Sequence, residues 1–444
     1  KESAYVTWTP VSGADGYNVY CKPIGGSYVQ LDSMLIRQYK GYFRADAVGL
    51  KPGSYVMKVV PTADGKEDTS KAVESDAITV GNYDRSGFAF SKNSPNGGTG
   101  VGAYNDDGTL KDDAIVLYLT EETKKTMKFD VKGSSGYVSC TGLVEILDAY
   151  SDGYDSRPLN IRIIGKVTAD GVVGANSDTN NLNLKTNNTK RIVKNITIEG
   201  IGDDAVCYGF GIRGLKIQSV EIRNIGIMLF GDDGIAFETA NKNIWVHNND
   251  IFYGTAGGDA DQAKGDGSLD LKNDSQYFTI SYNHFWDSGK MSLCGMKSET
   301  GENWITYHHN WFDHSDSRHP RIRTMSVHVY NNYYDGNAKY GVGAVLDADA
   351  FVEANYFRNC KYPMLICGQG SDTGTFDDGV GAMIKSYGNY IEGAKGYITQ
   401  NESSTSFDAY EVSSRNDKVP DSVKSLDGMG YNNFDTDSSI MYSY

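Results

Sequence analysis

Residues 305–312 read ITYHHNWF, and this arrangement of apolar residues around one asparagine returns along the second half of the chain. Its copies are VEIRNI (220–225), VHNNDI (246–251), ISYNHF (280–285), VYNNYY (329–334), VEANYF (352–357) and SYGNYI (386–391). The aligned residues are Asn224, Asn249, Asn283, Asn310, Asn332, Asn355 and Asn389, with spacings of 25, 34, 27, 22, 23 and 34. A strand repeat in the low twenties, with insertions at some coils and no room for helices, is the signature of a solenoid.

An asparagine at one fixed position of every coil predicts a ladder in which side-chain amides bond to the coils above and below. An ordinary sandwich with Asn-rich turns is the alternative, but seven in-phase copies argue against it. Leucine-rich repeats share the period, yet their repeated leucine framework is absent from this sequence. The repeat therefore predicts an all-β fold, a right-handed parallel β-helix.

The first part of the chain has a different pattern. Residues 1–80 alternate like half-buried strands, as in YVTW (5–8) and GYNVY (16–20), and the turn LKPGSY (50–55) feeds another such strand. These features resemble a fibronectin type III module and predict a small N-terminal β-sandwich. The polar, Gly/Asn/Ser-rich stretch 81–100 is predicted to be a linker, and residues 101–444 to form the β-helix domain, with one amphipathic helix over 141–149.

Composition excludes several classes of protein. Frequent Gly (51) and Tyr (31) with few Pro (9) suit short strands and tight turns. A net charge of −15 argues against nucleic acid or an anionic membrane as partner, and against a polyanionic substrate unless cations gather locally. No apolar run is long enough to span a bilayer, so no transmembrane segment is expected. Six scattered cysteines form no C-x-x-C pair, although Cys360 and Cys367 are close enough in sequence to pair.

Three aspartates fall on strands of adjacent predicted coils. Asp233 precedes GIAF (234–237), and Asp266 and Asp270 lie four residues apart in DGSLDLK (266–272). Residues four apart on a strand share a face, and the next coil stacks about 4.8 Å away, so the three can converge on one hard cation. Solvated turn aspartates are the alternative, and the place of these residues within the solenoid argues against it.

A basic cluster follows the Asn310 coil, in SRHPRIR (317–323). Arg318, Arg321 and Arg323 lie within six residues, and Lys290 of the preceding coil can reach the same groove. Such a cluster beside a cation site allows an acidic protein to hold a polycarboxylate. On spacing alone, structural Arg–Asp pairing is an equal alternative.

Four stretches closely resemble the pectate lyase family with the parallel β-helix fold. They are DGSLDLK (266–272), FTISYNHFWDSGKMSL (278–293), ITYHHNWFDHSDSRHPRIR (305–323) and VHVYNNYY (327–334). The resemblance runs through most of residues 101–400, and the R-x-P-x-x-R arrangement at 318–323 is its most specific part.

The resemblance implies calcium-dependent cleavage of de-esterified pectin, polygalacturonate, by β-elimination. It implies a Ca²⁺ site at Asp233, Asp266 and Asp270, with Asp266 at a position often held by Glu. It implies that Lys290 and Arg323 contact the uronate, with Arg321 beside them, and that Arg318 is the Brønsted base. Because Lys290, Arg323 and Ca²⁺ would each disfavour the charged form of Arg318, the direction suits a base.

One family motif is altered: WVHN (245–248) stands where W-I-D-H is usual, and it predicts changed packing away from the cleft. A second calcium, with Asp232, Asp259 and Asp261 as weak candidates, stays open. His308 and His309 are adjacent on one predicted strand and are expected to face opposite ways, which favours packing or hydrogen bonding over a zinc site.

Two other function classes compete. A polygalacturonase would use the same polymer with paired carboxylates, but the G-H-G and R-I-K motifs expected beside Asp232 and Asp233 are missing. A pectin lyase would lack the calcium carboxylates, and a non-catalytic binding solenoid would have no need to retain Arg318 with Lys290. The chain starts at Lys1 without a signal peptide and is interpreted as a trimmed form of a secreted protein, expected to be a monomer.

Overall fold

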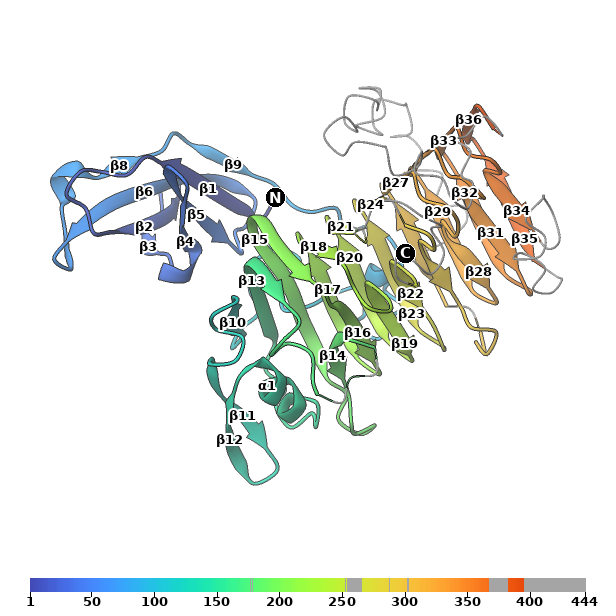
Figure 1. Cartoon of the computed structure of the whole chain (residues 1–444), viewed down its shortest axis with the longest axis horizontal. Coiled ribbons are helices and arrows are strands. Elements are labelled where there is room, and N and C mark those ends of the chain that lie inside the picture. Colours follow the sequence, from blue (N-terminus) through green and yellow to red (C-terminus); the bar gives the residue numbers. More distant parts are fainter. Residues whose placement is uncertain are drawn as a thin grey trace. The chain divides into compact units, whose positions relative to one another are not determined.

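The computed structural model (Figure 1) describes residues 1–175, 177, 179–251, 253, 266–286, 288–301, 303–366 and 382–394. The chain divides into two units. The first comprises Lys1–Arg85 with Ala103–Ala114, and the second comprises Ser86–Gly102 with the chain from Ile115 onward. The described part contains no helix with the length and apolar character that a membrane crossing requires.

The first unit is a small β-sandwich. One sheet has the order β1-β5-β4, and the other has β3-β2-β6-β7 with β8 and β9 also on β6. Alternating side chains of both sheets fill its core, among them Val19, Ala45 and Met57. The strands are β1 Ser3–Trp8, β2 Gly16–Pro23, β3 Val29–Gln30, β4 Ile36–Tyr39, β5 Tyr42–Val48, β6 Gly53–Ala63, β7 Lys66–Glu67, β8 Val73–Glu74 and β9 Ile78–Val80.

The second unit begins with β10 Ile115–Leu119, the hairpin β11 Lys128–Gly133 with β12 Gly136–Thr141, and the helix α1 Leu143–Tyr150. Leu143, Ile146, Leu147 and Tyr150 of α1 are buried, the spacing of one helical face. The helix predicted at 141–149 is therefore confirmed, starting two residues later than expected.

Two parallel sheets then run through the rest of this unit. The larger follows the order β10-β13-β15-β17-β18-β20-β21-β23-β24-β26-β27-β29-β30-β32-β33-β35-β36, and the smaller follows β14-β16-β19-β22-β25-β28-β31-β34. Each strand pairs with the equivalent strand one coil further on, as β20 pairs with β23 and β23 with β26. The inward side chains form one continuous apolar core. The predicted parallel β-helix is confirmed.

The strands of the larger sheet are β13 Leu159–Thr168, β15 Lys194–Tyr208, β17 Gln218–Arg223, β18 Gly226–Met228, β20 Lys242–His247, β21 Asp250–Ile251, β23 Gln276–Ser281, β24 His284–Trp286, β26 Ile305–His308, β27 Trp311–Asp313, β29 Ser326–Tyr330, β30 Tyr333–Asp335, β32 Asp349–Glu353, β33 Tyr356–Arg358, β35 Met383–Tyr387 and β36 Tyr390–Glu392. Those of the smaller sheet are β14 Asn181–Lys185, β16 Gly211–Leu215, β19 Ile235–Thr239, β22 Leu269–Leu271, β25 Leu293–Cys294, β28 Arg321–Arg323, β31 Val342–Val345 and β34 Met364–Ile366.

The asparagine ladder is present. Each side-chain amide donates at 3.0 Å to the Oδ1 of the next member, and that Oδ1 also accepts a backbone N–H. Its members are Asn249, Asn283, Asn310, Asn332, Asn355 and Asn389. Asn224 was wrongly aligned: it lies one position earlier, at the left-handed bend (φ 55°) that Asn248 and Asn331 also occupy. The backbone N–H of Ile225 takes the ladder position instead, donating to Asn249 Oδ1.

The segment 86–102, which includes most of the predicted linker, belongs to the second unit and lies along the larger sheet. Its 3₁₀ turn η3 Phe88–Phe90 donates backbone N–H groups to Thr306 Oγ1 and Thr279 Oγ1, at 3.0 and 3.1 Å. Phe88 packs on Trp304 and Phe90 packs on Trp245. These two aromatic anchors fix a stretch whose Gly- and Asn-rich composition resembles a linker.

The placement of His308 and His309 differs from the expectation, and some of the other predicted residues lie outside the described part of the chain. His308 and His309 do not face apart: their Nδ1 atoms lie 2.9 Å from each other, because β26 ends at His308 and His309 adopts φ 54°. Cys360 is buried, while Cys367, its proposed disulfide partner, lies outside the described residues, as do Asp259 and Asp261.

Candidate active site

The candidate residues gather on the outward face of the smaller sheet. In the register of that sheet, Ala236 pairs with Asp270, and Leu293 pairs with Arg321. Leu269, Leu271 and Ile322 beside them point into the core, so the alternation of the strands turns Asp270 and Arg321 outward. Coil stacking thus brings together residues that are up to ninety positions apart in sequence.

Three carboxylates form a cluster just before these strands begin. Asp232, Asp233 and Asp266 each offer an oxygen, and the three oxygens lie within 4.8 Å of one another. The backbone N–H of Asp266 donates to the carbonyl of Asp232 at 2.8 Å, which holds the two coils in register. Asp232, only a weak candidate for a second calcium, therefore belongs to the same cluster as Asp233 and Asp266.

Asp270 lies beside this cluster rather than in it. The Nζ of Lys272 contacts Asp233 Oδ2 at 2.8 Å and Asp270 Oδ2 at 3.1 Å, so one ammonium bridges the two aspartates. Gly267 fits between them: its N–H donates to Asp233 Oδ1 at 2.8 Å, and a Cβ there would lie 2.3 Å from Asp270 Oδ1. Lys272 was missed by sequence reasoning, although its place two residues after Asp270 puts both on one face of β22 and the residue that follows it.

Crowding of like charges marks the cluster electrostatically. Burial and the neighbouring Asp270 raise the pKa of Asp233 to about 7, despite Lys272 and the Gly267 N–H. Burial also raises the pKa of Asp232, and Asp266 adds to that shift. For Asp266 burial acts in the same direction, but Lys290, Arg318 and Lys272 outweigh it and its pKa is lowered.

This donor set fits a hard divalent cation. It consists of carboxylate oxygens, which Ca²⁺ prefers, and the carboxylates repel each other without a counter-charge. Asp233 and Asp266 are in the group as expected, Asp232 joins them, and Asp270 is held by Lys272 and by the N–H of Leu293 at 3.0 Å.

Lys290 and Arg318 occupy the next two coils. Lys290 forms β-bridges with Gly267 on one side and Ser317 on the other, and its Nζ contacts Asp266 Oδ1 at 2.8 Å. Arg318 follows Ser317 at φ 67°, ahead of the cis His319–Pro320 bond. Within the described ranges, the half-buried side chain of Arg318 makes no ion pair or hydrogen bond, whereas Lys290 and Lys272 are both paired.

The other two arginines flank this position on β28. Arg321 is buried and Arg323 is half-buried, and both project from the outward face. Burial raises the pKa of Tyr340, while Arg321 and Arg318 act against that shift, which places both guanidinium groups near its hydroxyl. The expected cluster of Lys290, Arg318, Arg321 and Arg323 therefore lies along one face of adjacent coils.

His319 lies behind Arg318. Its ring is fully buried between Ser315 Oγ, 2.7 Å from Nε2, and the carbonyl of Tyr340, 2.7 Å from Nδ1. Burial lowers the pKa of His319 to about 3, so this ring is a neutral brace for the turn. The altered motif WVHN lies on the larger sheet instead, where Trp245 stacks on His247 with ring centroids 3.6 Å apart.

Comparison with known proteins identifies the family. A family model described as pectate lyase matches residues 73–432. The pectate trisaccharide-lyase of Bacillus licheniformis is 31% identical over 50% of this chain and 62% of its own length. Pectate lyase 3 of Pectobacterium carotovorum is 36% identical over 42% of this chain and 52% of its own length. The chain thus spans only about half to three fifths of these curated relatives.

The fold is also shared with a solved structure. The pectate lyase of Bacillus sp. N165, solved in complex with trigalacturonate, superposes with a TM-score of 0.52 at 24% identity, covering 73% of this chain and 96% of its own. The parallel β-helix is common to both. With a family match that extends over most of its length, this chain belongs to the pectate lyase family.

Proposed function

We propose that this chain is a calcium-dependent pectate lyase that cleaves α-1,4-linked polygalacturonate by β-elimination and releases 4,5-unsaturated oligogalacturonides. The observation that carries the proposal is the position of Arg318. It is a half-buried guanidinium without an ion-pair partner among the described residues, one coil from Lys290 and near the carboxylate cluster of Asp232, Asp233 and Asp266. The names of the relatives, two of which act on pectate, support the substrate class.

The substrate presents a carboxylate next to the carbon that loses its proton. Lys290 is half-buried and pairs with the partly exposed Asp266, an ion pair that a uronate carboxylate can join or replace. Arg323 on the same face is placed to hold a second contact, with Arg321 beside it. A bound Ca²⁺ at the aspartates would supply a further positive charge to the substrate carboxylate and so acidify the adjacent C–H bond.

Arg318 then acts as the base. Its neutral guanidine takes the proton from C5, the C5–H electron pair forms the C4=C5 double bond, and the C4–O bond breaks with its electrons on the leaving oxygen. That oxygen takes up a proton as the new chain end leaves. Since Lys290 and Arg323 are cations, they disfavour the protonated form of Arg318, which is the direction a base requires.

An assay on polygalacturonate tests the proposal. The ultraviolet absorbance of the unsaturated product should rise with Ca²⁺, stay flat with EDTA, and return when Ca²⁺ but not Mg²⁺ is restored. New reducing ends without ultraviolet absorbance would instead indicate hydrolysis and exclude a lyase.

The remaining features of the chain complete the proposal. We propose a secreted monomer, consistent with an extracellular polymer as substrate. The first unit is proposed to be a fibronectin type III-like module, a view supported by Tyr55, whose hydroxyl donates to the carbonyl of Lys51 at 2.9 Å and so closes a tyrosine corner.

A further inference from the structure

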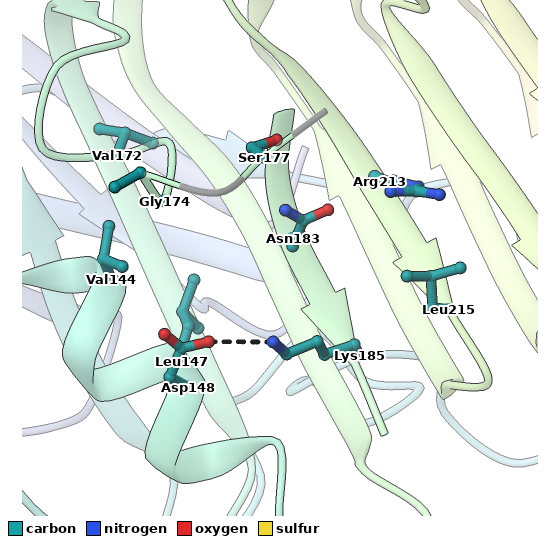
Figure 2. Close-up of a pocket in the computed structure, with 11 residues that line it drawn as sticks. Val144, Leu147, Asp148, Val172, Gly174, Ser177, Asn183, Lys185, Arg213 and Leu215 are labelled. Atoms are coloured by element: carbon teal, nitrogen blue, oxygen red, sulfur yellow. Dashed lines mark ion pairs between the residues drawn. The ribbon is translucent and has the colours of Figure 1, made fainter. Parts of the chain in front are cut away.

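A cavity lies on the outward face of the smaller sheet, near the start of the β-helix. It has a volume of about 480 Å³ and is lined by residues of α1, by Val172, Gly174 and Ser177, and by the strands β14 and β16. Figure 2 shows Asp148 on α1 facing Lys185 on β14, with Asn183 on the same strand and Arg213 on the neighbouring strand β16. The catalytic chemistry described above uses none of these residues.

The register of the sheet connects this cavity to the candidate active site. Asn183 pairs with Arg213, Arg213 pairs with Ala236, and Ala236 pairs with Asp270. These four residues therefore form one row on the outward face. With strands about 4.8 Å apart, three spacings place Asn183 roughly 14 Å from Asp270. A chain laid along this face from the candidate active site crosses β19 and β16 and then enters the cavity.

Both cations of the cavity are paired with carboxylates, and the pair made by Lys185 is weak enough to accept a ligand. Lys185 Nζ lies 3.1 Å from Asp148 Oδ1, with side chains 35% and 63% exposed, and exposed pairs of this kind contribute little stability. Arg213 Nε donates to Glu238 Oε2 at 2.7 Å and its Nη2 contacts the same oxygen, so a ligand carboxylate at Arg213 would share the guanidinium with Glu238. A ligand carboxylate can therefore share Lys185 and Arg213 without leaving a buried charge unpaired.

Two further features specify a sugar. The Oδ1 of Asn183 is buried and has no hydrogen-bond partner among the residues that the structure describes, so a hydroxyl group of a pyranose could donate to it. Val144, Leu147 and Leu215 line the cavity with apolar surface, against which the C–H face of a sugar ring packs.

We propose that this cavity is a distal subsite for a uronate unit of the same polygalacturonate chain that is cleaved near Arg318. Lys185 and Arg213 bind the carboxylate of the uronate, and the Oδ1 of Asn183 accepts a hydrogen bond from one of its hydroxyl groups. The inference rests on the proposed function. Its consequence is a preference for long substrates, because only a chain that reaches from the candidate active site to β14 fills both places.

Binding of galacturonate oligomers of three and eight units tests the subsite. The Arg318→Ala enzyme with Ca²⁺ is titrated calorimetrically with each oligomer, alone and combined with Asn183→Leu or Gly174→Phe. Gly174 lines the cavity, and a Cβ there meets only Val144 Cγ1 at 3.7 Å, so the phenylalanine fills the space without a backbone clash. Lys216→Gln is the matched control, since Lys216 is exposed immediately after β16 and lies outside the lining.

Both cavity variants should weaken binding of the long oligomer about 10-fold, a loss of roughly 1.4 kcal/mol. Binding of the short oligomer should change less than 2-fold, and the control should bind both as the parent does. Equal binding of the long oligomer by parent and both variants would overturn the subsite. Wild-type enzyme assayed in parallel separates the two proposals: failure to form unsaturated product refutes the lyase, whatever the binding data show.

Discussion

Two buried carboxylates on different faces of the β-helix have opposite electrostatics. Glu221 lies on the larger sheet next to Gly102 of the covering segment and is 0% exposed, and Asp233 precedes a strand of the smaller sheet and is 1% exposed. Glu221 accepts from Thr197 at 2.8 Å and contacts Arg223 at 3.2 Å and His247 at 3.0 Å. Burial raises the pKa of Glu221, but Arg223, His247 and Thr197 outweigh burial and the pKa is lowered.

At Asp233 the balance is reversed. Asp233 and Asp270 share the ammonium of Lys272, and burial together with Asp270 raises the pKa of Asp233 to about 7. Glu221 and Asp233 are equally buried, but the pKa of Glu221 is lowered and the pKa of Asp233 is raised. The protein itself stabilises the charge of Glu221, whereas a bound cation would stabilise the charge of Asp233. We therefore propose that the covered face is structural and that the smaller sheet carries the chemistry.

The largest expected effect comes from the arginine that lacks an ion-pair partner among the described residues. Arg318→Ala should lower kcat by about 10³-fold or more, within the range for a lost general base, while the Kd for polygalacturonate changes by less than about 3-fold. Arg318→Lys serves as the control for charge and should remain nearly as inactive. Turnover close to wild type in Arg318→Ala would contradict its role as base.

The largest effect on the stability of the fold is expected from a substitution at Glu221, on the larger sheet. Glu221→Gln removes the carboxylate that contacts Arg223 and His247, although Arg223 keeps its contact with Glu199 at 2.8 Å, and should lower the free energy of unfolding by about 2 kcal/mol. Urea titration measures this change, and Ca²⁺ affinity should remain that of the wild type. A variant as stable as the wild type would show that the carboxylate of Glu221 does not stabilise the fold through Arg223 and His247.

The corresponding substitution at Asp233, in the carboxylate cluster, should lower the affinity for Ca²⁺ and leave the stability unchanged. Asp233→Asn removes a carboxylate whose charged form is disfavoured by burial and by Asp270, so stability without Ca²⁺ should not fall. Calorimetric Ca²⁺ affinity should nevertheless drop about 100-fold, close to 2.7 kcal/mol. If Ca²⁺ binds the variant as tightly as the wild type, the aspartate cluster is not the calcium site.

The smallest effect concerns His319, the buried residue that follows Arg318. Because the pKa of His319 is lowered to about 3, below the ordinary value near 6.5, the unfolded chain binds the proton more readily. The stability contributed by neutral His319 is complete above pH 6.5 and is lost as the pH falls toward 3. From pH 6.5 to 5, the wild type should lose about 1.6 kcal/mol more of its free energy of unfolding than His319→Asn in unfolding titrations. Equal slopes would contradict a neutral buried ring.

The periodic part of the fold was predictable from sequence because the ladder needs one residue type at one place. Asn249 to Asn389 follow from this requirement, and coil stacking follows from the period. The misalignment of Asn224 has a physical cause: asparagine also suits the left-handed bend one position earlier, and spacing alone does not separate the two uses. The same bend made the expected orientation of His308 and His309 wrong.

The candidate site was predictable only to the level of which coils carry it. Asp233, Asp266, Lys290 and Arg318 do lie together. Asp232 joins Asp233 and Asp266 in the cluster because Asp266 precedes β22, while Asp270 lies on that strand beside the cluster and stays a predicted calcium ligand. Lys272 and the cavity at Asn183 depend on contacts between coils that no local motif encodes.

The most direct test of the account is the ultraviolet assay of the whole chain on polygalacturonate, with Ca²⁺ and with EDTA. The account predicts unsaturated product only with Ca²⁺, and none from Arg318→Ala under the same conditions. Product formation in EDTA, or cleavage that yields reducing ends without ultraviolet absorbance, would contradict it.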